Sequence, residues 1–280
     1  MNKVPDEYYN QIVTGDATEL LLRLPNDCID LTVTSPPYDT GMRVYEGYNF
    51  DFNVFLSMSE QLYRVTKENG VVVWIVGDKV IDGGESGTSF RQALSFKDAG
   101  FILYDTMIYE KAGPANPATG RYFQVFEYMF ILSKGKPKTF NPLKDRINTS
   151  YGKKWGKEKT NRLPSGEMRK TDFDISDGGK LGMRFNVWKY QVGHGFSASD
   201  IWAHQHPAIF PEALAADHIR SWSDIGDVVL DPMCGSGTTC KMAKETGRNF
   251  IGFDISEKYT KIAQKRIKYA QPPLFEQGQL

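Results

Sequence analysis

A glycine-rich turn near the end of the chain carries the clearest chemical signal in the sequence. Residues 228–239, VVLDPMCGSGTT, run from an apolar strand through Gly235 and Gly237 into an expected helix. Such a turn at the carboxyl end of a parallel strand holds nucleotide-like ligands, because glycine lets the backbone come close to the ligand. Cys240 occupies the place of the third glycine of a dinucleotide fingerprint, and no Gly-Lys is followed by Ser or Thr. The turn therefore does not match a pyrophosphate-binding loop.

An acidic residue follows the turn where a ribose contact is expected. Asp254 directly follows the next expected strand, residues 249–253, and lies 17 residues after Gly237. A carboxylate at this place accepts hydrogen bonds from ribose hydroxyls. The two features together predict a ligand with an adenosine-like ribose and without a pyrophosphate.

A second turn, TSPPY at residues 34–38, follows the apolar strand expected over residues 29–34. Two consecutive prolines fix the backbone and leave carbonyls without competing local donors. The Ser35 hydroxyl, the Pro36 carbonyl and the Tyr38 ring would then face a crevice, where they suit a planar amine. Taken alone, TSPPY fits a plain proline turn with a packed tyrosine equally well.

Basic residues gather in one segment, although the whole chain has no net charge. Residues 134–170 hold twelve Lys and Arg and three Asp and Glu, so they carry +9 and the other 243 residues carry −9. Asparagine, arginine and aromatic residues are interleaved with these lysines, which favours a DNA-contacting surface over a solvated face. The candidate DNA-binding residues are Lys153, Lys154, Trp155, Lys157, Lys159, Arg162 and Arg169.

The elements that must position these residues alternate between strands and helices, which predicts an α/β fold with a mostly parallel sheet. Gly70 is expected to end the second helix. The expected helices lie near residues 20–24, over 51–66 and 211–222, from 238 and around 259–267, and the expected strands over 29–34, 71–76, 101–109, 126–132, 227–230 and 249–253.

Periodicity is lost between about residues 134 and 199, a stretch too long for an idle loop inside a compact domain. We therefore expect an insertion at 136–200, between a half with TSPPY at 1–135 and a half with the glycine-rich turn at 201–280. The tail from Gln271 is expected to fray.

The composition excludes several classes of protein. The 280 residues are 40% apolar, 24% charged and 13% aromatic, which is globular rather than disordered, collagenous or disulfide-dense. The sequence has no apolar run of 18 residues, no CxxC pair and a polar N-terminus, so we expect an intracellular protein without a membrane span. His204 and His206 lack an acidic cluster, so we expect no metal.

Together the motifs DPMCGSGTT, FIGFDI, GDA from residue 15 and TSPPY resemble those of the S-adenosylmethionine-dependent amino-methyltransferases of DNA. The order, with TSPPY first and the cofactor turn last around an insertion, is similar to the beta class. Matching segments cover residues 15–134 and 206–267. The resemblance implies a Rossmann-like methyltransferase fold with a circularly permuted motif order. It also implies S-adenosyl-L-methionine as cofactor, double-stranded DNA as substrate, a cytoplasmic prokaryotic enzyme, and target recognition by the insertion at 136–200.

Residue by residue, the resemblance assigns the methyl-acceptor site to Ser35, Pro36, Pro37 and Tyr38. The glycine-rich turn would wrap the methionine part of the cofactor, and the segment 206–211 would close over it from the other side. The implied cofactor-binding residues are Asp16, Ala17, Ser35, His206, Pro207, Phe210, Asp231, Pro232, Met233, Cys234, Gly235, Ser236, Gly237, Thr238, Asp254 and Ile255.

These residue types suit methylation of an exocyclic amine. Hydrogen bonds from the NH₂ group to Ser35 and to the Pro36 carbonyl would favour a pyramidal nitrogen and stabilise its developing positive charge. The base must leave the duplex, and stacking on Tyr38 would offset part of the unstacking cost. In the family, SPPY is associated more often with N4-cytosine and DPPY with N6-adenine. Cytosine is therefore favoured, and adenine is the alternative.

Other classes fit less of the sequence. A dehydrogenase explains the glycine turn and Asp254 but not TSPPY, and carbon-5 cytosine methylation needs a Pro-Cys dipeptide that is absent. An RNA or protein-amide methyltransferase uses a similar turn and is the stronger rival, and a DNA-binding module without activity is a third alternative. The sequence leaves open a homodimer and a cognate restriction endonuclease as partners of a restriction-modification enzyme.

Overall fold

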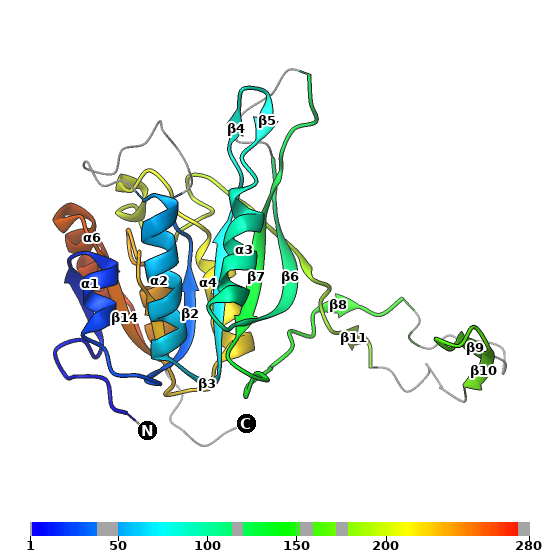
Figure 1. Ribbon diagram of the computed structural model, residues 1–280. Helices are drawn as coiled ribbons and strands as arrows, with labels where there is room; N and C mark the ends of the chain where they lie inside the picture. The colour runs from blue at the N-terminus through cyan, green and yellow to red at the C-terminus, as the bar shows by residue number, and fades with distance from the viewer. Residues whose placement is uncertain are drawn as a thin grey trace. The chain divides into compact units, whose positions relative to one another are not determined.

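An eight-stranded mixed sheet forms the centre of the larger of two units (Figure 1). The structure, a computed structural model, describes residues 2–37, 50–113, 120–149, 151, 159–171 and 179–273. The strand order is β1-β14-β13-β2-β3-β7-β6-β12, and β7 alone runs against its neighbours. These strands are Gln11–Thr14 (β1), Ile29–Thr34 (β2), Thr66–Val76 (β3), Ile102–Lys111 (β6), Phe126–Ser133 (β7), Val187–Tyr190 (β12), Val228–Asp231 (β13) and Asn249–Asp254 (β14).

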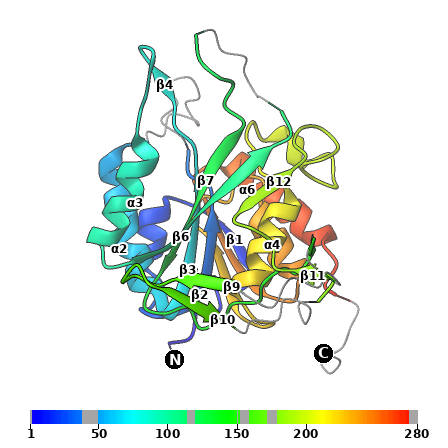
Figure 2. The same ribbon diagram turned by 90° about the vertical axis from the view of Figure 1, so that its right-hand side faces the viewer.

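Six helices cover the two faces of this sheet (Figure 2). One face carries Ala17–Leu22 (α1), Phe52–Val65 (α2) and Thr88–Asp98 (α3), and the other carries Glu212–Trp222 (α4), Thr238–Glu245 (α5) and Glu257–Tyr269 (α6). A short 3₁₀ helix, Ala203–Gln205 (η2), precedes α4. Among the described residues, no helix combines the length and apolar composition needed to cross a bilayer.

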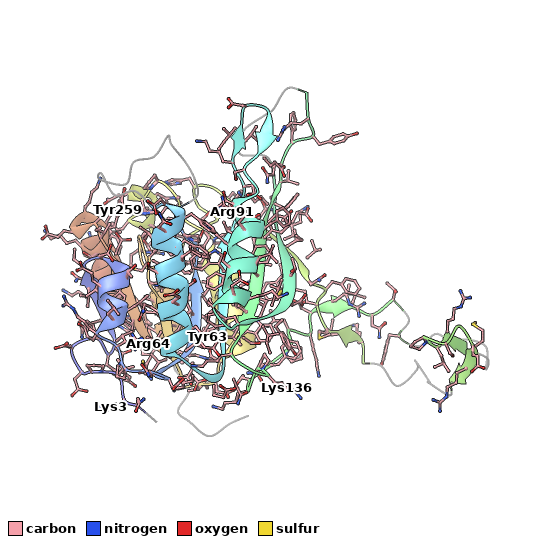
Figure 3. The ribbon with its side chains drawn as sticks, viewed as in Figure 1. Lys3, Tyr63, Arg64, Arg91, Lys136 and Tyr259 are labelled. Carbon is pink, nitrogen blue, oxygen red and sulfur yellow. The ribbon has the colours of Figure 1, made fainter. Side chains whose placement is uncertain are left out.

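Helix starts follow local capping chemistry. Asp16 and Asp51 stand immediately before α1 and α2, and each side chain accepts backbone N–H groups of the first turn. At the other end of α1, the Arg64 guanidinium donates to the carbonyls of Leu21 and Leu24 at 2.7 and 2.8 Å. Figure 3 shows Arg64 at the edge of the sheet opposite the one near Tyr259. Arg64 of α2 therefore links the end of α1 to α2 at the edge of the sheet away from the motifs.

The α/β class and the mostly parallel sheet expected from the sequence are confirmed. The expectation that Gly70 ends the second helix was wrong, because the helix ends at Val65 and Thr66 already has extended backbone. Gly70 lies inside β3, where a Cβ would be 2.8 Å from the Thr66 side chain and 3.0 Å from the Asp30 carbonyl. It allows close approach at the register shift between β2 and β3.

Helix α3 was not expected, and its burial pattern explains why. Phe90 and Leu94 are about half exposed, whereas the polar side chains of Ser89 and Gln92 are buried. Gln92 accepts a hydrogen bond from the buried Trp74 indole at 2.8 Å. Apolar periodicity therefore does not reveal this helix.

The second unit is Pro142–Phe185, which is narrower than the expected insertion at 136–200. On the amino side Asn141 bonds to the Ser221 carbonyl of α4, and on the carboxyl side β12 pairs with β6. Both flanks therefore belong to the larger unit. The second unit holds two antiparallel pairs, Arg146–Ile147 (β8) with Leu181–Gly182 (β11) and Lys159–Arg162 (β9) with Met168–Thr171 (β10).

Gly237 brings the glycine-rich turn into close contact with helix α6. It has a φ of +79°, and a Cβ there would lie 2.7 Å from the Cβ of Ala263 in α6. Gly87 also has a positive φ, +65°, but no atom lies within 4 Å of its Cβ position. We expect Gly87→Ala to lower the free energy of unfolding by about 1–2 kcal/mol from backbone strain alone. Gly237→Ala should cost about 1–3 kcal/mol more from overpacking. Urea denaturation measures both, and equal losses would contradict the contact with α6.

Candidate functional site

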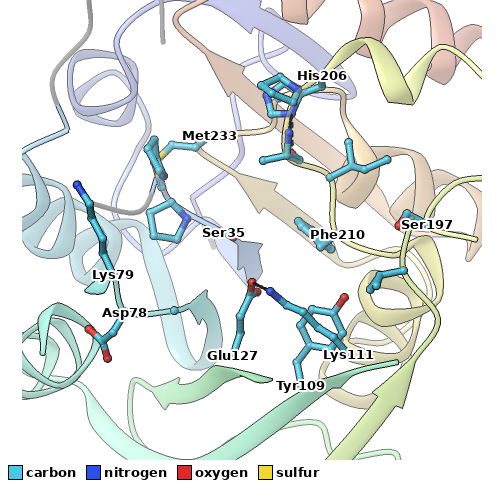
Figure 4. Close-up of a pocket in the computed structure, with 18 of the residues that line it drawn as sticks. Ser35, Asp78, Lys79, Tyr109, Lys111, Glu127, Ser197, His206, Phe210 and Met233 are labelled. Carbon is cyan, nitrogen blue, oxygen red and sulfur yellow. Dashed lines mark hydrogen bonds and ion pairs between the residues drawn. The ribbon is translucent and has the colours of Figure 1, made fainter. Parts of the chain in front are cut away.

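A pocket of about 1350 Å³ lies at the edge where the parallel strands end (Figure 4). Its lining comes from the segments after β1, β2, β3, β6, β12, β13 and β14, all in the larger unit. Between β13 and β2 the chain order reverses, since β13 leads to β14 on one side and β2 to β3 on the other. Ligands of open α/β sheets bind at such a switch point.

A buried hydrogen bond joins the two strands that carry the motifs. The Thr34 hydroxyl donates to Asp231 Oδ1 at 2.7 Å, and both residues are essentially inaccessible to solvent. Beside it, the Thr239 hydroxyl of α5 donates to the Val33 carbonyl at 3.0 Å. The turn that follows Thr34 and the turn that follows Asp231 are thus held next to each other.

Asp231 supports the glycine-rich turn from below. Its Oδ1 also accepts the Met233 N–H at 3.2 Å. Burial raises the pKa of the Asp231 carboxyl to about 6, because desolvation outweighs the hydrogen bonds from Thr34, Met233 and Thr239.

Asp254 holds the turn from the side of β14. Its two oxygens accept the N–H groups of Gly235 at 2.8 Å and Ser256 at 2.9 Å. Asp254 therefore fixes the backbone of the turn at Gly235 and the start of α6 at Ser256. Cys234 also donates its N–H to the Phe253 carbonyl at 2.7 Å, which keeps the turn against the end of β14.

The segment 206–210 lines the pocket opposite the glycine-rich turn. The His206 ring packs edge-on against Tyr259 of α6, with centroids 4.3 Å apart. A Cβ on Gly235, whose φ is +49°, would lie 2.8 Å from His206 Nε2. Only glycine at 235 therefore lets the two walls come together.

An ion-pair network behind the pocket links these walls. Lys241 of α5 contacts Asp200 at 3.1 Å and Glu212 at 2.6 Å, and Arg266 of α6 contacts the same two carboxylates at 2.8 and 2.7 Å. The side chains of Lys241 and Arg266 are 6% and 0% exposed. Burial opposes ionisation of both acids. Hydrogen bonds from Arg266 and Lys241 nevertheless hold the pKa of Asp200 below its ordinary value. The hydrogen bond from Lys241 does the same for the pKa of Glu212.

Arg266 continues this network into the glycine-rich turn. Its Nη1 donates to the Ser236 carbonyl at 2.7 Å and lies 3.2 and 3.1 Å from the Ser236 and Thr238 hydroxyls. Glu212 begins α4 directly after the segment 206–210. One buried network therefore positions both the turn and the wall opposite it.

Most of the expected site residues meet in this pocket. Those that line it are Ala17, Ser35, Pro36, Pro37, His206, Pro207, Phe210, Met233, Cys234, Gly235, Ser236, Thr238, Asp254 and Ile255. The expected cofactor residues Asp16, Asp231, Pro232 and Gly237 do not line it, because they belong to the backbone supports behind it. Asp16 caps α1, where it accepts the Thr18 N–H at 2.8 Å.

Several of the expected site residues lie outside the part of the chain that the structure describes or in the second unit. Tyr38, Lys153, Lys154, Trp155 and Lys157 lie outside the described residues. Lys159 contributes its backbone to β9, and Arg162 and Arg169 are exposed on the β9–β10 pair of the second unit. Their roles stay predictions.

An ion pair that the sequence analysis did not single out lines the pocket on the side of β6 and β7. Lys111 ends β6 and pairs with Glu127 near the start of β7, and Tyr109 lies beside them. Burial, and then Glu127, raise the pKa of Tyr109. In the sequence, this ion pair is indicated only by Glu127, an acidic residue inside the apolar strand FEYMFILS.

The three cysteines are buried thiols and form no disulfide. Desolvation raises the pKa of Cys234 and Cys240 well above the ordinary value. Over the described ranges, no group of His, Cys, Asp and Glu is arranged to hold a metal ion.

Comparison with known proteins agrees with this geometry. Residues 29–265 match the model of the N6/N4 methyltransferase family described as DNA methylase. The chain is 54% identical to the orphan methyltransferase M.BamHII of Bacillus amyloliquefaciens over 86% of this chain and 90% of that protein. It is 27% identical to the Type II methyltransferase M.BglII of Bacillus subtilis over 92% and 69%. The solved complex of M1.HpyAVI with SAM aligns at a TM-score of 0.60 and 23% identity over 92% and 98%.

Replacing Arg266 should weaken cofactor binding directly, in addition to any loss of folding stability. We expect Arg266→Met to raise the dissociation constant for S-adenosylmethionine about 10-fold or more, since charged hydrogen bonds to the turn are lost. Arg248 is the matched control, because this half-buried arginine caps the Ser223 and Thr246 carbonyls at the other edge of the sheet. Arg248→Met should lower the melting temperature without changing the dissociation constant. Isothermal titration measures binding, and an unchanged constant for Arg266→Met would contradict the positioning role.

Asp231 should make stability fall as the pH rises. Its folded pKa of about 6 lies above the ordinary 3.8, so the stabilising contribution is complete below about pH 4 and is lost by about pH 6. Asp231→Asn keeps an oxygen for Thr34 and Met233 but does not titrate. From pH 4 to 7 the wild type should therefore lose up to about 3 kcal/mol relative to this variant. Urea denaturation at several pH values measures this difference, and parallel pH profiles would contradict the raised pKa.

Proposed function

The chain belongs to the DNA methylase family of N6/N4 methyltransferases, and on this premise we propose that it methylates the exocyclic N4 amine of a cytosine flipped out of duplex DNA. S-adenosylmethionine is the cofactor of this family and supplies an activated methyl group. One observation supports the proposal: the Thr34–Asp231 hydrogen bond holds the turn that begins at Ser35 beside the glycine-rich turn, and both turns line one pocket.

The turn residues supply what the reaction requires of the protein. Ser35 and Pro36 line the pocket directly after β2, where their oxygens can accept the two N–H bonds of an amine. These bonds orient the nitrogen lone pair and stabilise the positive charge that develops on it. Pro37 holds the turn rigid, and Tyr38 is proposed to stack on the base.

Serine at position 35 supports cytosine as the substrate base. It grips an NH₂ group without placing a full negative charge beside it, as an aspartate at this position would. N6 methylation of adenine by the same site is the second candidate, because the hydrogen-bonding requirement of its amine is the same.

The second unit is proposed to recognise the target duplex. It holds eleven basic and six acidic residues and so carries a net charge of +5, which leaves −5 for the larger unit. Phosphate attraction therefore favours the second unit, and the exposed Arg162 and Arg169 are its described candidates. Lys153, Lys154, Trp155 and Lys157, which lie outside the described residues, are further candidates.

The biological setting is proposed from the relatives. The name Type II methyltransferase supports a cytoplasmic restriction-modification enzyme with a cognate endonuclease, whereas the name orphan supports an enzyme that works alone. An endonuclease gene beside the gene for this chain distinguishes the two. Sedimentation of the pure protein decides whether it forms a homodimer.

The product of methylation tests the proposal directly. The protein is incubated with S-adenosylmethionine and unmethylated genomic DNA, and nucleosides from the digest are identified by mass spectrometry. N4-methylcytosine is expected. N6-methyladenine would overturn the choice of base, and no methylated nucleoside from protein that binds the cofactor would favour an RNA or protein acceptor.

Ser35→Ala tests the acceptor turn. It should lower kcat about 10- to 100-fold through the lost hydrogen bond in the transition state, with unchanged cofactor affinity. Ser57→Ala on the exposed face of α2 is the control and should have full activity. If Ser35→Ala turned over like Ser57→Ala, the acceptor site would lie elsewhere.

A further inference from the structure

The wall of the pocket beyond the acceptor turn holds a buried ion pair that the chemistry so far does not use. Lys111 and Glu127 contact each other with side chains 21% and 10% exposed, and both line the pocket. Across the described residues Glu127 is the one ionic partner of Lys111. An ammonium has three donors, so N–H groups of Lys111 are available to a ligand.

The sheet places this pair on the far side of the acceptor turn from the cofactor turn. Met233 follows β13, Ser35 follows β2, and Glu127 lies in β7, two strands beyond β2 in the order β13-β2-β3-β7. Figure 4 shows the same sequence across the pocket, with Ser35 between Met233 and the Lys111–Glu127 pair. A base gripped at Ser35 therefore has the cofactor on one side and this pair on the other.

The spacing fits a pyrimidine that is held at the two ends of one edge, at N4 and at O2. Two strand spacings separate the ends of β2 and β7 by about 10 Å. A cytosine is about 4.5 Å from N4 to O2, and two hydrogen bonds of about 2.9 Å bring the span to about 10 Å. Because Lys111 is paired to Glu127, its ammonium is placed toward β7 rather than above its own strand.

The chemistry of the pair distinguishes cytosine from adenine. Along the edge that begins with the N4 amine, cytosine presents the acceptors N3 and O2, which suit the Lys111 ammonium. Adenine presents N1 and then a C–H group, which leaves a donor at the O2 position without a partner. Discrimination by an unsatisfied buried group is strong.

Glu127 neutralises the charge of the Lys111 ammonium near the reacting amine. An unpaired lysine would oppose the positive charge that develops on the amine, whereas the pair has no net charge. A largely buried ion pair is a weak source of stability, so a role in recognition is the better explanation for its position in the pocket.

We propose that Lys111, held by Glu127, donates to the O2 edge of the flipped base and makes this methyltransferase specific for cytosine. This inference rests on the proposed function and deepens it, because it assigns the residue that chooses the base. Lys111 is then a binding residue for the substrate, and Glu127 is a positioning residue.

A double variant separates recognition from structural support. Lys111→Met together with Glu127→Met replaces the pair with apolar side chains and leaves no unpaired charge, a change that is often neutral for stability. The target site is first located by sequencing methylated genomic DNA, and duplexes with cytosine or adenine at the target position are then compared. We expect kcat/KM on cytosine to fall about 10- to 100-fold and the rate on adenine to stay unchanged, so the cytosine-to-adenine ratio collapses.

Matched controls complete the design. Glu110 and Lys189 form an exposed ion pair on β6 and β12 that does not line the pocket, and Glu110→Met with Lys189→Met should leave the ratio unchanged. Lys111→Arg retains a cationic donor and should recover part of the cytosine rate. Cofactor affinity should be the same in every variant.

The outcomes distinguish this inference from the function on which it rests. If the wild type forms N6-methyladenine, the choice of cytosine fails and the inference fails with it. If the wild type forms N4-methylcytosine but the double variant keeps the same ratio, the proposed function stands and the inference about Lys111 is overturned. An equal fall on both bases also overturns it, because the pair would then only support the fold.

Discussion

The hydrogen bond between Thr34 and Asp231 is the constraint on which the site depends. It joins residues 197 positions apart in the chain and lies in the buried seam between β2 and β13. The same seam is the switch point of the sheet, so the two turns that follow these strands must open into one crevice. Residues that lie far apart in the sequence are thereby brought to the two sides of one pocket.

Two groups of ion-paired side chains lie at the walls of the pocket. Lys241 and Arg266 meet Asp200 and Glu212 behind the cofactor turn, and Lys111 meets Glu127 on the side of β6 and β7. Such pairs gain little net stability over apolar packing, but removing one partner is costly. We therefore infer that these pairs fix the placement of the loops that they join. Apolar side chains, which are more interchangeable, would specify that placement less well.

The sequence predicted the parts of the fold that have strong local signals. Strands with β-branched residues, such as 29–34, and the glycine-rich turn were found because their chemistry is contained within a few adjacent residues. The four-residue strand β12 and helix α3 were missed, since one is too short for a pattern and the other exposes Phe90 and Leu94. The expected site residues that line the pocket come mainly from these short motifs.

Contacts between distant segments were not predictable in this way. Arg266 reads in the sequence as one more basic residue of an amphipathic helix, and only the fold shows that it is fully buried against the cofactor turn. Glu127 reads as an interruption of an apolar strand until β6 brings Lys111 beside it.

The partition of charge between the two units follows a physical logic under the proposed function. A body with a net charge of −5 repels the phosphate backbone, so electrostatic attraction to DNA must come chiefly from the unit with +5. The base itself carries no charge, and the pocket grips it with the Ser35 and Pro36 oxygens and an ion pair of zero net charge. Affinity for the duplex and selection of the base are thus supplied by different parts of the chain. A change in salt concentration therefore acts on the first much more than on the second.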